Sequence, residues 1–300
     1  MRAVRVALSG SSGLIGGALA RLLVEDGATV VRLVRSQAGV GEILWDPVAG
    51  KADAAGLDGV DAIIHLAGEN IASRRWNPEQ KEKIRKSRVD GTRLLAETAA
   101  GLENKPKVFI CASAVGYYGN RSETVDESSP SATGFLADLC SQWEAAAQAA
   151  SDAGIRVVYA RIGVVLSPKG GALKKMLIPF KMGVGGPLGD GSQPMPWIAL
   201  DDVLGALRFL LERGELSGPF NLTSPNCVTN GEFTKALGRA VRRPAVLPMP
   251  AFAVKMLFGE MGEALLLGGA KVYPRRLEEA GFHFRFPKVE DALNHVLSSV

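Results

Sequence analysis

The stretch from Val4 to Gly16 reads VRVALSGSSGLIG, and it decides which fold the chain adopts. Its apolar run, Val4 to Leu8, has the length and composition of a buried strand. Three glycines follow at three-residue spacing, Gly10, Gly13 and Gly16. Apolar residues then recur at helical spacing, at Leu14, Ala18, Leu19, Leu22 and Leu23. The stretch therefore predicts a strand, a tight turn and an amphipathic helix in immediate succession.

Each glycine has a mechanical role in such a unit. One permits the tight turn, one lets the backbone approach a pyrophosphate, and one brings the helix close to the strand. Free N–H groups and a partial positive charge at the start of the helix favour a phosphate there. The spacing G-x-x-G-x-x-G is a variant of the dinucleotide-binding fingerprint. We therefore expect a dinucleotide to contact Gly10, Ser12, Gly13, Leu14, Ile15 and Gly16.

The composition is that of a soluble globular protein, with 47% hydrophobic and 22% charged residues among 300. The net charge of +4 gives little support for nucleic-acid binding. Three widely spaced cysteines fit a reducing compartment. No apolar run approaches the roughly 18 residues of a membrane span, and the N-terminal run is a short strand rather than a signal peptide. We expect a cytoplasmic protein with no membrane or nucleic-acid partner.

Strands and helices alternate along the first half of the chain. Further strands are expected at residues 30–34, 62–66, 108–112 and 156–161, and helices at about residues 78–100 and 136–150. Alternation at this spacing predicts an α/β fold with a parallel, doubly wound sheet of the Rossmann type. Right-handed crossovers place the carboxyl ends of the strands along one edge, where such sheets bind ligands.

The character of the chain changes after Val164. Proline, glycine and methionine accumulate from Ser167 to Pro196, a segment that we expect to be irregular. Helices are expected again from Asp201 onward. We therefore assign residues 1–165 and 200–224 to the nucleotide-binding domain, and residues 166–199 and 225–300 to a smaller substrate-binding lobe.

The end of the second strand, at Arg35 and Ser36, indicates which dinucleotide is bound. An NAD-binding sheet usually has Asp or Glu there, about 20 residues after the glycines, to hold the ribose 2′-hydroxyl. An arginine would instead pair with a 2′-phosphate, and the missing carboxylate removes repulsion against it. The alternative is an arginine that is simply solvated at the strand end. We expect the cofactor to be NADP(H).

The strand at residues 62–66 carries His65 among apolar residues, so we interpret His65 as a packed core residue rather than a catalytic base. The small residues that follow, Ala67 and Gly68, let a cofactor approach the backbone closely. The other histidines, His283 and His295, are far away in the sequence. No metal site is expected.

Four motifs resemble those of extended short-chain dehydrogenases/reductases and occur in the same order: the glycine turn, His65–Gly68, Ser113–Gly119 and Arg161–Leu166. More narrowly, the chain resembles NADP-binding "epimerase family" proteins, sometimes mislabelled cell-division inhibitors. That resemblance rests on short motifs along the whole chain, among them Trp45-Asp46-Pro47, Trp143-Glu144, Pro196-Trp197-Ile198 and the tail from Gly268 to Arg275. It implies a Rossmann fold, a small C-terminal domain of unknown function, an unassigned substrate, and NADP(H) contacts at Leu66, Ala67, Gly68 and Ile162.

One departure from that family concerns its catalytic pair. Active members carry Tyr-x-x-x-Lys on the helix after the serine-bearing strand, where lysine lowers the pKa of the tyrosine, and tyrosine passes a proton as hydride moves. Counting back from Trp143-Glu144 places this pair at Leu136 and Cys140. Neither side chain can do that work, and the motif occurs nowhere else in the chain.

Four residues near the strand ends are candidates for the chemistry. Ser113 could donate a hydrogen bond to a substrate carbonyl. Tyr117 and Tyr118 follow it and could give a proton, or could simply cover the cofactor crevice. We favour Tyr118 as the proton donor, because its Tyr-Gly pairing matches the family's strand-end pattern. Glu69 could act as an acid or bind a substrate hydroxyl or amine, or could only cap a helix or be solvated.

Arg88 stands where extended family members often carry asparagine. It could reach the cofactor phosphates or an acidic substrate, and the alternative is an ion pair one turn away on an exposed helix face. The glycine-rich segment 183–197 is expected to form a wall of the substrate pocket. Trp76, Met195 and Trp197 could offer a stacking surface there or could simply be packed.

Two functions fit these observations. The first is an NADP(H)-dependent oxidoreductase or epimerase acting on a small carbonyl or sugar-like substrate, favoured by the nucleotide site and the polar residues beside it. The second is a noncatalytic NADP(H)-binding redox sensor or interaction protein, favoured by the missing Tyr-x-x-x-Lys. The fold alone does not choose between them. We favour the enzyme, and a homodimer is left open.

Overall fold

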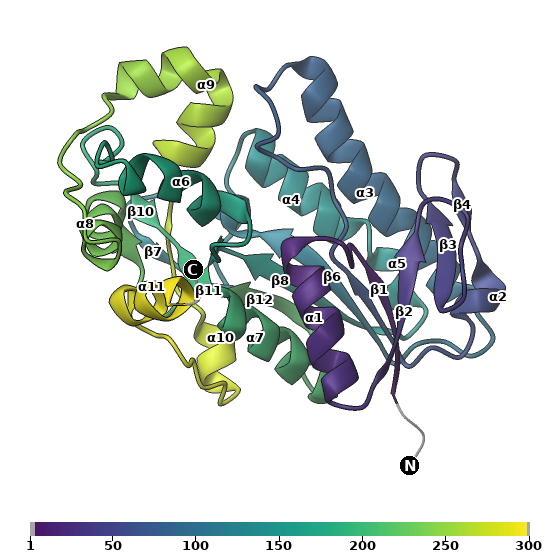
Figure 1. Cartoon of the computed structure of the whole chain (residues 1–300). Helices are drawn as coiled ribbons and strands as arrows, with labels where there is room; N and C mark the ends of the chain where they lie inside the picture. Colours follow the sequence, from purple (N-terminus) through teal and green to yellow (C-terminus); the bar gives the residue numbers. More distant parts are fainter. Residues whose placement is uncertain (1–3, 299–300) are drawn as a thin grey trace.

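The computed structural model describes residues 4–298 and is built on an eight-stranded sheet (Figure 1). In spatial order the strands are β12 (Gly218–Leu222), β8 (Arg156–Ile162), β6 (Val108–Ala114), β5 (Ala62–His65), β1 (Arg5–Ser9), β2 (Thr29–Val34), β3 (Glu42–Asp46) and β4 (Lys51–Ala52). Neighbours are parallel except β3 and β4, which form an antiparallel pair. The predicted α/β, Rossmann-type parallel sheet is confirmed.

The strand order places a topological switch point between β1 and β5. From β1 the chain proceeds to β2 and β3 on one side, and then returns to β5, β6, β8 and β12 on the other side. Open α/β sheets bind ligands at the carboxyl ends of the strands, where the order reverses. The glycine turn follows β1, and residues 66–68 follow β5, so both candidate segments lie at this point.

Helices cover both faces of the sheet, because successive side chains of each buried strand point to opposite sides. Ala7, Ile63 and Phe109 pack on one face against α3 (Pro78–Ala100), α4 (Phe135–Ala145) and α5 (Gln148–Asp152). Leu8, Ile64 and Ile110 pack on the other face with α1 (Leu14–Glu25), α7 (Leu200–Glu212) and α10 (Arg275–Glu279). This layered core fixes the strand ends that carry the site.

The later segments form a smaller lobe at one end of the sheet (Figure 1). Its helices are α6 (Gly171–Lys181), α8 (Asn230–Ala240), α9 (Ala251–Leu266) and α11 (Val289–Leu297). Its short strands are β9 (Val164–Leu166), β10 (Pro194–Met195), β11 (Trp197–Ala199) and β13 (Val228–Thr229). A core of its own, including Leu173, Phe180, Phe233 and Leu293, joins α6, α8 and α11 with the short strands.

Two expectations about local structure are wrong. The segment 167–196 is not irregular throughout, since it contains α6, a helix that accommodates Pro179. The helix expected at 136–150 is two helices, α4 and α5.

Of the two alternatives for Met195 and Trp197, packing is confirmed, because both are buried in the core of the smaller lobe.

Helix α10 belongs to the core of the main sheet. Its Leu277 packs there, although its sequence position falls in the range assigned to the smaller lobe.

Among residues 4–298, no helix is long and apolar enough to cross a membrane.

Candidate functional site

The glycine turn after β1 is pressed against the backbone that follows β5. Gly10 has a φ of +69°, and a Cβ on it would lie 2.8 Å from the carbonyl carbon of Leu66 and 2.9 Å from the amide nitrogen of Ala67. A Cβ on Gly16 would lie 2.2 Å from the carbonyl oxygen of Gly10. Only glycine fits at either position. The close approach predicted from the spacing is therefore present in the backbone.

The start of α1 leaves its N–H groups unused by side chains. Its N-cap is Gly13, no side chain caps it, and its first turn carries no acidic residue. Ser12 and Gly13 are exposed, while Leu14 and Ile15 are half-buried. Such an N-terminus attracts a phosphate through its N–H groups and the helix dipole. The turn and the uncapped start of the helix therefore fit the diphosphate of a dinucleotide.

A buried pair, Ser9 and His65, fixes the two halves of this crevice. The Ser9 hydroxyl accepts hydrogen bonds from the amides of Leu66 (3.1 Å) and Ala67 (3.2 Å). It lies 2.6 Å from Nδ1 of His65, to which it donates because its acceptor sites are taken. His65 is fully buried, as its apolar strand predicted, and burial lowers its pKa to about 3. The imidazole is thus a neutral structural group.

Arg35 and Ser36 lie exposed just beyond the end of β2. Within the described part of the chain Arg35 forms no ion pair, whereas the neighbouring Arg32 binds Glu42 at 2.7 Å. Three strand spacings, about 14 Å, separate β2 from β6, which carries Ser113. Arg35 and Ser113 therefore lie at opposite ends of the crevice, as the two ends of an extended dinucleotide would require.

Arg88 of α3 reaches back to the loop after β5. Its Nη1 donates to the carbonyl oxygen of Glu69 at 3.0 Å, and its guanidinium lies over the ring of Trp143. A Cβ on Gly68 would lie 3.3 Å from the guanidinium carbon. Burial lowers the pKa of Arg88. Arg88 therefore belongs to the crevice rather than to an exposed ion pair on the helix surface.

Glu69 itself lies half-exposed on the same loop. Its amide is held by the Ser87 hydroxyl at 2.9 Å, and its carboxylate accepts only a long hydrogen bond, 3.5 Å, from Ser73. The backbone of Glu69 is therefore fixed, and its carboxylate remains accessible for a ligand.

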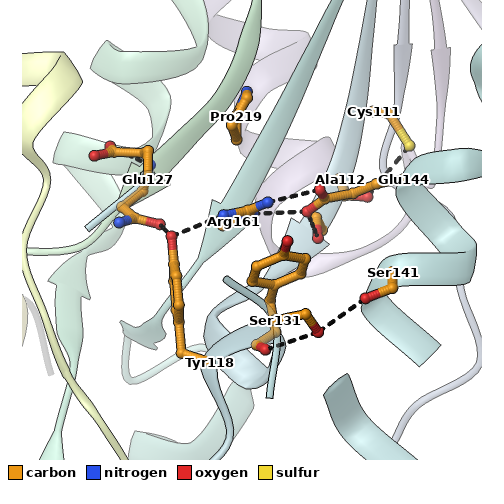
Figure 2. A network of polar contacts seen from close by, with 12 residues as sticks. Cys111, Ala112, Tyr118, Glu127, Ser131, Ser141, Glu144, Arg161 and Pro219 are labelled. Atoms are coloured by element: carbon orange, nitrogen blue, oxygen red, sulfur yellow. Dashed lines mark hydrogen bonds and ion pairs between the residues drawn. The ribbon is translucent and has the colours of Figure 1, made fainter. Parts of the chain in front are cut away.

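A buried ion pair occupies the ends of β6 and β8. Ser113 and Arg161 are direct neighbours in the two strands, and both contact Glu144 of α4. Arg161 donates to the carboxylate through Nε and Nη2, each at 2.8 Å, and the Ser113 hydroxyl donates to it at 2.7 Å. Figure 2 shows Arg161 between Glu144 and Tyr118. Burial alone lowers the pKa of Arg161, but its interactions with Glu144 outweigh this and raise it.

The two tyrosines after β6 lie in different environments. Tyr118 is fully buried, its hydroxyl donates to Asn221 at 2.8 Å and accepts from Arg161 at 2.9 Å, and burial raises its pKa to about 12. Tyr117 is half-buried, with the guanidinium of Arg161 3.5 Å from the centre of its ring. Within residues 4–298 no group forms a hydrogen bond with the Tyr117 hydroxyl. Tyr117 is thus the better placed of the two to meet a ligand.

Sequence reasoning missed the Glu144–Arg161 pair. Leu136, Cys140 and Glu144 lie at intervals of four on one face of α4, so the polar group stands one turn beyond the positions of Tyr-x-x-x-Lys. A signal was available in Arg161, because an arginine inside an apolar strand requires a buried acidic partner. Asn221, on β12, was missed because that strand was not recognised.

The chain is similar to known proteins over nearly its whole length. Residues 6–223 match the model of the NAD dependent epimerase/dehydratase family, and residues 249–296 match a domain of unknown function, DUF1731. The chain is 47% identical over 292 residues to "Epimerase family protein Mb2239" of Mycobacterium bovis, covering 97% of this chain and 96% of that protein. It is 39% identical over 299 residues to "Epimerase family protein SDR39U1" of Homo sapiens, covering 98% and 100% respectively.

Two solved structures are similar over nearly the whole chain. The crystal structure of human epimerase family protein SDR39U1 (isoform2) with NADPH has a TM-score of 0.92 and 38% identity, covering 99% of this chain and 100% of that chain. The nucleoside-diphosphate sugar epimerase from Corynebacterium glutamicum has a TM-score of 0.83 and 36% identity, covering 99% of this chain and 59% of that chain. These findings confirm the resemblance drawn from the motifs, with its nicotinamide dinucleotide cofactor and its C-terminal domain of unknown function.

The buried ion pair generates a prediction about stability. Replacing Glu144 by Gln leaves the Arg161 guanidinium, whose side chain is 4% exposed, without a counter-charge. Breaking a buried pair in this way costs about 3–5 kcal/mol of unfolding free energy. Urea denaturation should show that loss, whereas Glu290→Gln, which breaks the exposed pair with Arg239, should change the value by less than about 1 kcal/mol. Equal effects of the two variants would contradict the prediction.

His65 generates a prediction about pH. Its pKa of about 3 in the folded protein lies below the ordinary histidine value of 6.5, so between these values the unfolded chain binds a proton that the folded chain does not. The unfolding free energy contributed by this group should therefore fall as pH falls below 6.5, by about 1.4 kcal/mol per pH unit. Chemical denaturation at pH 7 and pH 5 should give a shallower dependence for His65→Asn than for the unaltered protein. Parallel dependences would show that the prediction is wrong.

Proposed function

The chain belongs to the NAD dependent epimerase/dehydratase family, and on that premise we propose that it is an NADP(H)-dependent oxidoreductase acting on a small carbonyl or sugar-like substrate. The observation that carries the proposal is a glycine turn packed against the backbone after β5 at the switch point of the sheet, with Arg35 at one end of the crevice and Ser113 and Tyr117 at the other. A dinucleotide lying across that edge presents its nicotinamide beside a half-buried phenol. Bound NADP(H) supplies or accepts the hydride.

The choice of NADP(H) over NAD(H) rests on Arg35. Its guanidinium is exposed, and in the described residues no carboxylate pairs with it. It can therefore form a charge-assisted hydrogen bond with a 2′-phosphate. The human relative whose solved structure contains NADPH supports the same choice.

We assign proton transfer to Tyr117 rather than Tyr118. The Tyr118 hydroxyl is enclosed between Asn221 and Arg161, and burial raises its pKa to about 12, which disfavours proton release. The Tyr117 hydroxyl carries no protein hydrogen bond, and the Arg161 guanidinium lies on the face of its ring. That cation stabilises negative charge developing on the ring as the hydroxyl gives its proton to a substrate oxygen.

The Ser113–Glu144–Arg161 group has a positioning role in this proposal. Glu144 binds the Nε and Nη2 groups of Arg161 and the hydroxyl of Ser113, and Nη1 of Arg161 donates to Tyr118, so the cation stays fixed against the ring of Tyr117. Arginine remains charged at all working pH values, as a lysine in Tyr-x-x-x-Lys also does. Glu69, with an accessible carboxylate across the crevice, is assigned to binding a substrate hydroxyl or amine.

The cofactor assignment predicts the behaviour of Arg35→Ala. Loss of one charge-assisted pair should weaken NADPH binding about ten- to a hundredfold and leave NADH binding nearly unchanged. Calorimetric titration with each dinucleotide measures both values. Arg32→Ala is the matched control, because Arg32 lies on the same strand and already binds Glu42. Equal affinities of the unaltered protein for NADPH and NADH would overturn the assignment.

The proton-transfer assignment predicts different outcomes for two conservative variants. A carbonyl substrate is first identified by following NADPH absorbance. On that substrate, Tyr117→Phe, which keeps the ring and removes the hydroxyl, should lower kcat about 10²- to 10⁴-fold. The affinity for NADPH should not change. Tyr118→Phe leaves the Asn221 and Arg161 groups unpaired, and should lower the unfolding free energy by about 1–3 kcal/mol with a smaller effect on kcat. Full activity of Tyr117→Phe would exclude it as the donor. A protein that binds NADPH and turns over no member of a broad carbonyl panel would favour the noncatalytic alternative.

A further inference from the structure

The smaller lobe contains a cavity of about 350 Å³ that the proposed reaction does not use. Its walls come from α6, α8 and two chain segments, 184–188 and 247–250. The lining is almost wholly apolar and includes Met176, Phe180, Val184, Phe233, Leu247 and Met249. The volume lies at the lower end of the range for small-molecule sites, which are lined by apolar side chains with a few polar groups.

The two segments that close the cavity are joined by backbone hydrogen bonds. The amide of Leu247 donates to Gly185 at 3.2 Å, and the amide of Met249 donates to Pro187 at 2.9 Å. A Cβ on Gly186 would lie 1.9 Å from the carbonyl oxygen of Leu247, so the segments are in direct backbone contact. The cavity is therefore preformed rather than opened by side-chain movement.

Few polar atoms reach the cavity. Asn230 and Thr234 line it and are 6% and 3% exposed. The Asn230 carboxamide oxygen already accepts from the amide of Leu188 at 2.8 Å, while the Thr234 hydroxyl forms no hydrogen bond within residues 4–298. A sugar would lose water from several hydroxyls that find no partner here, at a cost in affinity for each. The lining of the cavity therefore favours a hydrocarbon chain over a sugar.

A cationic hollow adjoins the cavity. Lys235, Arg239, Arg242 and Arg243 line it together with Val246, which is next in sequence to the cavity residue Leu247. In the part of the chain that the structure describes, no acidic side chain lines this hollow. Arg239 binds Glu290 at 3.1 Å, but among residues 4–298 no carboxylate pairs with the other three cations. Val246 and Leu247, 71% and 54% exposed, connect the two hollows at the surface.

From this juxtaposition we infer that the smaller lobe binds an anionic amphiphile of the alkyl carboxylate class. The alkyl chain fills the apolar cavity, and the carboxylate lies on the hollow that carries Lys235 and Arg242. The two hollows match the two properties that such a molecule combines, because one buries hydrocarbon and the other is lined by four cationic side chains. This site is separate from the dinucleotide crevice, and the inference does not depend on the proposed reaction.

A chain-length series on the unaltered full-length protein tests the inference. Calorimetric titrations with hexanoate, octanoate and decanoate, each below its micelle-forming concentration, should show affinity rising about three- to fourfold per added methylene until the cavity is full. Decanol, which lacks the charge, should bind more weakly than decanoate. An affinity that is independent of chain length, or equal for decanol and decanoate, would overturn the proposal.

Two variants locate the ligand, each with a matched control. Met176→Trp fills the cavity and should abolish decanoate binding, whereas Ile178→Trp, on the same helix at a position that is 65% exposed and does not line the cavity, should not. The double variant Lys235→Glu, Arg242→Glu should weaken the binding of decanoate at least tenfold and leave the binding of decanol unchanged. The control Lys107→Glu, at an exposed site elsewhere, should change the affinity for neither ligand.

Thermal unfolding and NADPH binding establish that each variant is folded. If Met176→Trp does not fold, the chain-length series and the Lys235→Glu, Arg242→Glu variant test the proposal instead. Unchanged binding of decanoate to a folded Met176→Trp variant would place the ligand elsewhere and overturn the proposal. The proposal would also be overturned if the protein sedimented with vesicles of anionic phospholipid but did not bind free decanoate. That result would indicate contact with a membrane surface instead.

Discussion

The contact between the turn after β1 and the backbone after β5 is the constraint on which the crevice depends. Gly10 touches Leu66 and Ala67 so closely that no side chain fits between them. The Ser9 hydroxyl joins the same segments by hydrogen bonds, and the neutral, buried His65 orients that hydroxyl. The strand order brings these segments together, and the missing side chain at Gly10 permits their close backbone contact. A single local geometry thus gives the fold its ligand-binding edge.

The Glu144–Arg161 pair is a second constraint, and it couples a helix to the sheet. In the family pattern α4 would present Tyr-x-x-x-Lys to the cofactor, but here Leu136 and Cys140 stand at those positions. The polar group lies one turn further on, where Glu144 fixes Arg161 against Tyr117. A permanent cation beside a phenol therefore persists, although it comes from a strand and the phenol comes from a loop. The proton-transfer role that we propose for Tyr117 depends on this arrangement.

Sequence alone predicted the parts of the fold that depend on regular periodicity. The strand and helix around the glycines, and α3 at residues 78–100, were recognisable because apolar spacing and glycine positions act locally. α6 was not recognised, because Pro179 and the surrounding glycines resemble a loop while lobe packing stabilises the helix. The preference for Tyr118 came from a local pattern, whereas its enclosure by Asn221 depends on β12, over 100 residues later. Contacts between distant segments carry no signature in a single sequence.

Helix α6 contacts both α1 and the cavity of the smaller lobe. At its start, Gly170 and Gly171 lie against Leu14 of α1, and a Cβ on either would be 3.4 to 3.5 Å from that side chain. Further along the helix, Met176 and Phe180 line the cavity. Eleven residues of helix span about 16 Å. One packed helix therefore separates the cavity from the glycine turn, and the packing of α6 supports both.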